Sequence, residues 1–326
     1  MRIHLDQVVV DLASDNNHLI AEWERLFEGW LTTSNPSPPA IIRLTLQACR
    51  QLPALPPDPP FFRDNLLSDG SGILSVYRQP QNHVLLHFLD GALVGVPLDP
   101  LADNKNPEAH GKVTAQALQN GRFEDVTFTS LAPLLRRQGY FLVHAFAAAR
   151  NGRCVLIVGA TRSGKTTTGL NLLLNGWDLL SNDVVMLRHQ AEGIYAYPTP
   201  GDVGIRRHTF NLLPQLATCL PSEYPTDQAI NISGQQLING RWAKPCIVNA
   251  IFLPKIITGN HSKVIPLPRA VCLAHLMQES IDRWDEPCLQ AHINILQHLC
   301  KQVNTFSLNL GQDMAQVPKL ISTYSR

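Results

Sequence analysis

Residues 159–166 read Gly159-Ala160-Thr161-Arg162-Ser163-Gly164-Lys165-Thr166, and they match the pattern G-x-x-x-x-G-K-[ST] at every fixed position. The short apolar run before them, residues 153–158, is rich in β-branched side chains and predicts a buried strand. The run after them, residues 166–175, places Leu170, Leu173 and Leu174 on one helical face, and Gly176 is typical of a helix end. The sequence therefore predicts a strand, a glycine-rich turn and a helix in succession.

This succession predicts a site for the phosphate groups of a nucleotide. Glycines let backbone N–H groups point at phosphate oxygens, and the start of the following helix directs its positive end at the same anion. The ammonium group of Lys165 is then expected to reach the β and γ phosphates, and the hydroxyl of Thr166 to ligate Mg²⁺. The predicted nucleotide-binding residues are Gly159, Ala160, Thr161, Arg162, Ser163, Gly164, Lys165, Thr166 and Thr167.

Composition limits the classes of protein to which the chain can belong. Its 326 residues suffice for one large or two medium domains, and 44% hydrophobic with 16% charged residues is typical of a compact, soluble protein. A net charge of +1 argues against a general nucleic-acid or membrane-surface binder. Seven cysteines without a C-x-x-C pair argue against a disulfide framework and a structural zinc site. Because Asp6 comes too early for a signal peptide and no apolar run reaches membrane-spanning length, we expect a cytoplasmic protein.

Residues 1–125 predict an accessory α+β domain that is rich in strands. Five apolar runs predict strands, at residues 7–12, 41–46, 72–77, 84–88 and 93–96. Turn-forming residues separate the last three of them, which is the pattern of a β-meander. An amphipathic run after Asp15 or Asn16 predicts one helix. This half contains no catalytic constellation, so we expect the chemistry to lie in residues 126–326.

A hairpin is predicted directly before the glycine-rich turn. Residues 141–149 form one apolar run, and Asn151-Gly152 is a strong signal for a tight turn into the next strand. This prediction places His144 on the antiparallel neighbour of the strand that enters the turn. A histidine in such a strand is either a hydrogen-bonded core residue or a functional group, and the sequence leaves both interpretations open.

Polar residues follow a second strand beyond the turn. Residues 178–183 predict a strand that ends in Asp183, where a carboxylate can reach Mg²⁺ directly or through water. The alternative interpretation of Asp183, a turn aspartate, is weakened because residues 184–187 continue as a strand. Arg206 and Arg207 come further along, and they suit either a grip on phosphate or on an acidic substrate, or the solvated start of a helix.

The region from about Leu131 to His208 resembles the HPr serine kinase/phosphorylase family, whose members share a nucleotide-binding core with PEP carboxykinase. Three features carry the resemblance: Leu142-Val143-His144-Ala145 ahead of the turn, the leucine-rich helix ending Asn175-Gly176-Trp177, and Leu179-Leu180-Ser181-Asn182-Asp183-Val184-Val185. Residues 1–125 do not resemble the amino-terminal domain of these enzymes. The resemblance implies a divergent member with an α/β fold, in which a PEP carboxykinase-like P-loop core with a mixed sheet occupies residues 126–326.

The resemblance also implies roles for individual residues. Lys165 and Thr166 would handle phosphates and Mg²⁺, His144 would lie close to the transferred phosphate, and Asp183 would take the second acidic position near the metal. Asn182 departs from the family, which usually has an aspartate there as the candidate base for the acceptor hydroxyl. Asparagine cannot accept that proton at neutral pH, so Asp183 or His144 would have to take over the role.

The resulting hypothesis is an ATP- and Mg²⁺-dependent kinase that transfers a phosphoryl group to a serine or threonine hydroxyl of a peptide or small protein. Its candidate residues are Asp183, His144 and Lys165 for catalysis, Thr166 and Asp183 for the metal, and Asn182, Arg206 and Arg207 for phosphate or acceptor binding. The alternatives are a nucleotide-binding regulatory protein that has lost its chemistry, and a kinase for small molecules. We expect neither nucleic acid nor membrane as a partner, and a homo-oligomer is compatible with the sequence.

Overall fold

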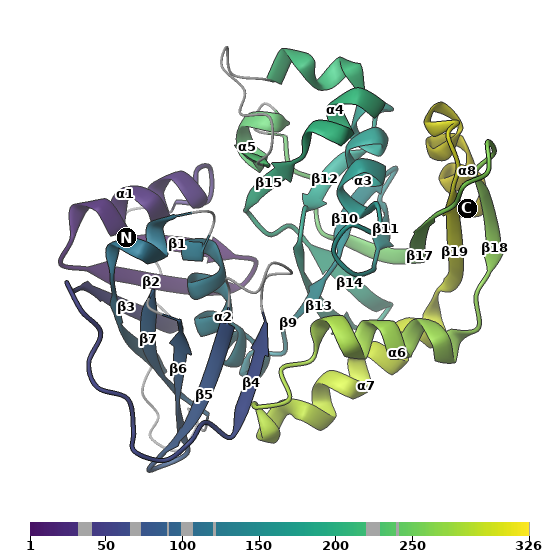
Figure 1. Cartoon of the computed structure of the whole chain (residues 1–326). Helices are drawn as coiled ribbons and strands as arrows, with labels where there is room; N and C mark the ends of the chain where they lie inside the picture. The colour runs from purple at the N-terminus through teal and green to yellow at the C-terminus, as the bar shows by residue number, and fades with distance from the viewer. Residues whose placement is uncertain are drawn as a thin grey trace. The chain divides into compact units, whose positions relative to one another are not determined.

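The computed structural model describes residues 1–31, 41–65, 73–89, 91–98, 107–119, 122–219, 229–238 and 241–325. The chain divides into two compact units, which Figure 1 shows together. Unit 1 comprises Met1–Tyr140 and Asp282–Gln290, and unit 2 comprises Phe141–Ile281 and Ala291–Arg326. Within the described part of the chain, no helix combines the length and the apolarity that crossing a membrane requires.

Unit 1 is built on one sheet of eight strands. In spatial order these are β1 (Arg2–Leu5), β2 (Val8–Ser14), β3 (Ile42–Ala48), β8 (Glu108–Val113), β7 (Ala92–Pro97), β6 (His83–Phe88), β5 (Ile73–Gln79) and β4 (Phe62–Asn65). Strands β2, β3 and β8 pair in parallel, and the other neighbours pair antiparallel. The meander predicted from the sequence is therefore confirmed as β5, β6 and β7.

Helices and a short 3₁₀ turn complete unit 1: α1 (Asn17–Leu26), η1 (Ala115–Leu118) and α2 (Arg122–Arg137). The side chain of Asn16 caps α1 by accepting from the backbone N–H of His18 at 2.9 Å, as the sequence suggests. Trp23 is fully buried, and its Nε1 donates to Thr127 Oγ1 at 3.1 Å, which links α1 to α2. The sequence places the domain boundary at residue 125, inside α2, whereas the two compact units divide after Tyr140 because α2 packs on β3 and β7.

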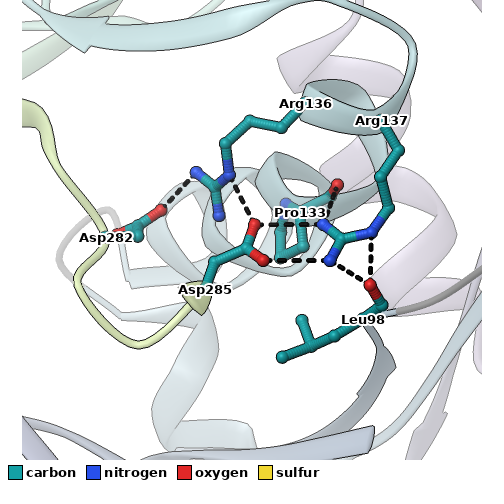
Figure 2. Close-up of polar contacts among 6 residues, drawn as sticks. All are labelled: Leu98, Pro133, Arg136, Arg137, Asp282 and Asp285. Atoms are coloured by element: carbon teal, nitrogen blue, oxygen red, sulfur yellow. Dashed lines mark hydrogen bonds and ion pairs between the residues drawn. The ribbon is translucent and has the colours of Figure 1, made fainter. Parts of the chain in front are cut away.

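A later segment of the chain, Asp282–Gln290, also belongs to unit 1 (Figure 2). Arg136 donates to Asp285 at 2.7 Å and to Asp282 at 2.6 Å. Arg137 donates to the same Asp285 at 3.0 Å and to the carbonyl oxygen of Leu98 at 2.6 Å. A buried charge is tolerable only when it is paired and hydrogen-bonded, and Asp285 is 1% exposed. This network therefore fixes the segment within unit 1.

Unit 2 is built on a mixed sheet of nine strands. Seven lie in the order β12 (Asp178–Ser181), β10 (Phe146–Arg150), β11 (Arg153–Ile157), β17 (Cys246–Ile256), β14 (Gly193–Tyr197), β13 (Val184–Gln190) and β9 (Phe141–His144). Strand β17 is long enough to pair with β14 at its start and with β19 (Asn304–Leu310) along the rest, and β18 (Lys263–Pro266) lies beside β19. The pairs β11–β17 and β17–β19 are parallel, and the others are antiparallel.

The single strand predicted for residues 141–149 is wrong, because the run breaks at Ala145. Its first part, β9, pairs with β13, whereas its second part, β10, pairs with β11 through the predicted Asn151-Gly152 turn. The backbone N–H of Ala145 donates to the carbonyl oxygen of Asp183 at 2.9 Å, and this hydrogen bond stabilises the chain where the two strands separate. His144 is therefore a neighbour of β13 and not of β11.

Helices cover both faces of this sheet. They are α3 (Lys165–Leu174), α6 (Arg269–Ser280), α7 (Glu286–Gln302, in unit 2 from Ala291) and α8 (Val317–Tyr324), together with the short α4 (Arg207–Leu212), α5 (Gly234–Leu237), η2 (Pro214–Cys219) and η3 (Met314–Gln316). Side chains alternate along β11, so that Cys154 and Leu156 pack in the core under α6 and α7, and Val155 and Ile157 pack under α3 and α8. A small sheet of β15 (Asp202–Ile205) and β16 (Ile230–Ser233) adjoins α3.

Candidate active site

The glycine-rich loop, defined here as residues 159–166, connects β11 to α3 as the sequence predicts. Upstream of it, the backbone N–H of Val158 donates to Phe252 on β17 at 2.9 Å, which anchors the loop to the sheet. Gly164 precedes α3 with a φ of +104°, in the left-handed region, and a Cβ atom there would lie 2.7 Å from Leu310. The backbone conformation therefore favours glycine at this position, whereas the side chain of Leu310 could shift to make room for a Cβ atom.

Lys165 is the first residue of α3, and its side chain turns back over the loop. It is only 7% exposed, and its Nζ donates to the carbonyl oxygen of Gly159. Burial lowers the pKa of Lys165, and the negative charges of Asp183 and Glu279 oppose that effect. Two carboxylates thus act electrostatically on the lysine of the loop.

His144 lies between the same two carboxylates. Its Nε2 is 2.8 Å from Asp183 Oδ1, and its Nδ1 is 3.4 Å from Glu279 Oε2. Its backbone N–H donates to Ser280 Oγ at 3.1 Å. Only the protonated imidazole can donate from both ring nitrogens, and two carboxylates can only accept, so the geometry suits the imidazolium.

Electrostatics in this cluster favour the charged forms of His144, Asp183 and Glu279. Burial by itself would lower the pKa of His144, but the charge and hydrogen bond of Asp183 and the hydrogen bond of Glu279 outweigh burial and raise it to about 9. Partial removal of the Asp183 carboxylate from water likewise opposes its ionisation, yet His144 and Lys165 together lower the pKa of that carboxyl. The hydrogen bond of His144 is the main cause of the lowered pKa of Glu279. At neutral pH the imidazole of His144 is therefore a cation between two anionic carboxylates.

Backbone pairing explains why these residues meet. His144 ends β9 and is paired with Val184 of β13, so Asp183 lies beside it directly before β13. Helix α6 packs on β9, and its last turn carries Glu279 and Ser280. The half-exposed side chain of Asp183, at 54%, is the most open of the three, whereas Glu279 is 15% exposed.

Glu279 is a site residue that the sequence did not indicate. The sequence predicts a helix through this region, but no motif or spacing connects Glu279 to His144. Only the tertiary packing of α6 on β9 brings them together. An acidic residue near the end of a helix was the sole signal, and such residues are common on solvated helix faces.

Asn182 points away from this cluster. Its Nδ2 donates to the carbonyl oxygen of Asp202 on β15 at 3.0 Å. Its Oδ1 is buried and has no hydrogen-bond partner among the described residues. The amide therefore ties the end of β12 to β15, beside the candidate metal carboxylate of Asp183.

Arg206 and Arg207 are exposed at the start of α4. Neither guanidinium forms an ion pair within the described ranges, and neither is in contact with His144 or Asp183. Helix α4 nevertheless adjoins α3, because the hydroxyls of Thr167 and Thr209 are 2.9 Å apart. The structure thus brings Lys165, His144 and Asp183 together, and it leaves the two arginines at the periphery, one turn from the contact with α3.

Comparisons with known proteins give little guidance for this chain. No model of a known protein family matches it, and no curated protein sequence matches it. Among solved structures, the Hpr(Ser) kinase/phosphatase from Coxiella burnetii matches with 11% identity and a TM-score of 0.30, over 56% of this chain and 94% of that chain. At that TM-score the two folds correspond only weakly, and the likeness establishes no function.

Proposed function

We propose that the chain is an ATP- and Mg²⁺-dependent phosphotransferase that moves the γ-phosphoryl group of ATP to a serine or threonine hydroxyl of a peptide or small protein. One observation carries the proposal: the buried Lys165 of the glycine-rich loop lies in the field of Asp183 and Glu279, and both of these carboxylates also contact His144. A phosphate loop, an acid for a metal and a cation for the transferred group are the parts that phosphoryl transfer needs.

The loop residues fit the phosphates of a nucleotide. A Cβ atom at position 159 would lie 2.9 Å from Ser163 Oγ, so this position leaves the backbone open for a close approach. The Ser163 hydroxyl is itself buried without a partner among the described residues, which leaves a donor for a phosphate oxygen. Lys165 would release the carbonyl of Gly159 and pair with the β and γ phosphates.

Thr166 and Asp183 would hold the metal. The imidazole of His144 hydrogen-bonds to Oδ1 of Asp183. Because the Asp183 side chain is half-exposed, its Oδ2 remains available to a cation. Mg²⁺ is commonly bound by one or two protein oxygens together with phosphate oxygens, so these two residues suffice. No group of three His, Cys, Asp or Glu residues suited to a metal occurs in the described ranges. When bound, Mg²⁺ supplies neutralisation of charge on the phosphate oxygens.

The raised pKa of His144 supports one of its two candidate roles, that of a cation. With a pKa of about 9, the imidazole is protonated at neutral pH and cannot accept the proton of an acceptor hydroxyl. We therefore assign it the role of a cation that stabilises the transferred phosphoryl group. Asp183 receives the proton at Oδ2, the oxygen that His144 leaves open, and would hold the metal through water. A carboxylate with a lowered pKa is a weak base, which phosphoryl transfer tolerates because its transition state depends mainly on positioning and charge.

The rival function is a nucleotide-binding regulatory protein without turnover. Asn182 favours this regulatory function. Its amide donates to the carbonyl oxygen of Asp202 and supplies no base beside Asp183. The two functions share the nucleotide site and differ only in whether the γ-phosphoryl group leaves ATP.

Calorimetric titration with ATP and Mg²⁺, followed by transfer from γ-labelled ATP to pooled serine and threonine peptides, tests the proposal. Lys165→Ala should lose ATP binding and all transfer, whereas Lys301→Ala, which removes an exposed ammonium group in the last turn of α7, should keep both. Binding without transfer or ADP release would favour the regulatory function. An absence of Mg²⁺-dependent ATP binding by the unaltered protein would refute both functions.

A further inference from the structure

Unit 2 contains a cavity at the end of β11 opposite to the glycine-rich loop. Its volume is about 480 Å³, which lies in the range of small-molecule sites in proteins. Strands β10 and β11, the start of β12 and the end of α8 surround it. The residues that line it are Arg150, Asn151, Arg153, Val155, Trp177, Ser322 and Ser325. Since Arg153 begins β11 and the loop follows its last residue, Ile157, this cavity is separate from the candidate active site.

Two arginines face each other at its rim. Asn151 and Gly152 have φ angles of +53° and +74°, as a tight two-residue hairpin requires, and this turn makes Arg150 and Arg153 direct cross-strand partners. Like charges directly opposite each other destabilise an antiparallel pair. Neither arginine forms an ion pair with any described residue, including Asp178, which is paired in register with Ala149. The fold itself gives no reason for this repulsion.

A buried donor lies in the same cavity. Trp177 is 6% exposed, and its Nε1–H has no acceptor among the described residues. An unpaired buried donor is costly, and an indole nitrogen can only donate. Val155 and the indole ring add apolar surface to the lining, and Ser322 and Ser325 add hydroxyl groups. The cavity therefore combines two cations, a free donor and an apolar wall.

We propose that this cavity binds a small phosphate monoester, with its phosphate between Arg150 and Arg153 and its organic part against Val155 and Trp177. Two guanidinium groups can each bind a phosphate through parallel hydrogen bonds, and a phosphate dianion balances two positive charges. A carboxylate carries half that charge and offers fewer acceptor oxygens, so it matches the pair less well. The bound anion converts the repulsion between the arginines into a shared attraction.

Titration of the ¹⁵N-labelled full-length protein with phenyl phosphate tests this site. The chain has five tryptophans, and Trp177→Phe identifies the indole N–H signal of Trp177. Phenyl phosphate should shift this signal in a saturable manner, and inorganic phosphate should do so with lower affinity, because it lacks the apolar part. The shift should persist in Lys165→Ala, which separates this site from the glycine-rich loop and from the proposed activity.

Variants of the rim complete the test. Arg150→Gln and Arg153→Gln should each weaken phenyl phosphate binding about tenfold, whereas Arg269→Gln, an exposed arginine of α6 on the other face of the sheet, should leave it unchanged. Without ligand, either rim variant should be at least as thermally stable as the unaltered protein, because the repulsion is relieved. The proposal is overturned by an unmoved Trp177 signal at about 10 mM phenyl phosphate, or by equal affinity in Arg150→Gln.

Discussion

The imidazole of His144 and the carboxylate of Asp183 lie 2.8 Å apart, although 39 positions separate them in the chain. Glu279 contacts the other ring nitrogen of the same imidazole at 3.4 Å. The histidine is thereby held as a cation next to the lysine of the glycine-rich loop. This arrangement gives the cluster a defined dependence on pH.

Replacing His144 with asparagine should lower the free energy of unfolding. The size of this loss should depend on pH. The folded-state pKa of His144, about 9, lies above the ordinary value of 6.5, so the protonated imidazole stabilises the fold fully below about pH 6.5. That contribution is lost as the pH rises through 9. The difference in unfolding free energy between the two proteins, at most about 3 kcal/mol from this source, should shrink between pH 6.5 and 9. Urea unfolding at several pH values measures it, and a difference that does not vary with pH would contradict the assignment.

Glu279→Gln should lower the pKa of His144 from about 9 toward its ordinary value, because one of the two stabilising carboxylates is removed. An NMR titration of the histidine ring protons reports this pKa directly. Glu286→Gln, which alters an exposed carboxylate that pairs with Arg78, is the matched control and should leave the titration unchanged. An unaltered His144 titration in Glu279→Gln would show that the 3.4 Å contact has no electrostatic weight.

Asn182→Asp should destabilise the protein and should not raise the rate of phosphoryl transfer. The amide now donates to the carbonyl of Asp202, whereas a carboxylate would set two acceptors against each other at a cost of about 1–3 kcal/mol. Denaturant unfolding and the transfer assay measure the two effects separately. If the carboxylate instead acted as a missing general base, transfer would accelerate by about 10²-fold or more, and the structural role assigned to Asn182 would be wrong.

Asp285→Asn should be among the most destabilising single changes in unit 1. Asp285 pairs with both Arg136 and Arg137 and is 1% exposed, so its loss leaves the buried guanidinium of Arg137 without a counter-ion and that of Arg136 with Asp282 alone, at a cost of about 3–5 kcal/mol. Asp282→Asn should cost less, because that side chain is 30% exposed. If denaturant unfolding showed the same loss of unfolding free energy for Asp285→Asn and Asp282→Asn, burial would not govern the strength of this network.

The sequence predicts the helices, strands and turns that neighbouring residues determine. It does not predict the features that depend on contacts between distant segments of the chain. The strand, the glycine-rich turn and the helix around Lys165 are confirmed as elements, since apolar runs and glycines encode them. The break at Ala145 was missed because it depends on a backbone bond to Asp183, and an apolar run of nine residues carries no mark of it. The role of the segment from Asp282 to Gln290 was hidden for the same reason.

The site was predicted only in part, by the same logic. Lys165 and Asp183 stand beside recognisable strand and loop patterns, and they lie in one cluster as expected. Glu279 reaches the cluster only through the packing of α6, and the partner of Asn182, the carbonyl of Asp202, comes from a different sheet. Neither residue has a sequence spacing that could reveal its neighbour.

The most direct test of the central claim uses Mn²⁺ as a paramagnetic replacement for Mg²⁺, together with a non-hydrolysable ATP analogue. If the glycine-rich loop, Asp183 and His144 form one site, the ring-proton signals of His144 should broaden only when both the metal and the nucleotide are present. The broadening should vanish in Lys165→Ala, which cannot hold the phosphates, and persist in Lys301→Ala. A His144 signal that stays sharp with saturating metal and nucleotide would contradict the account.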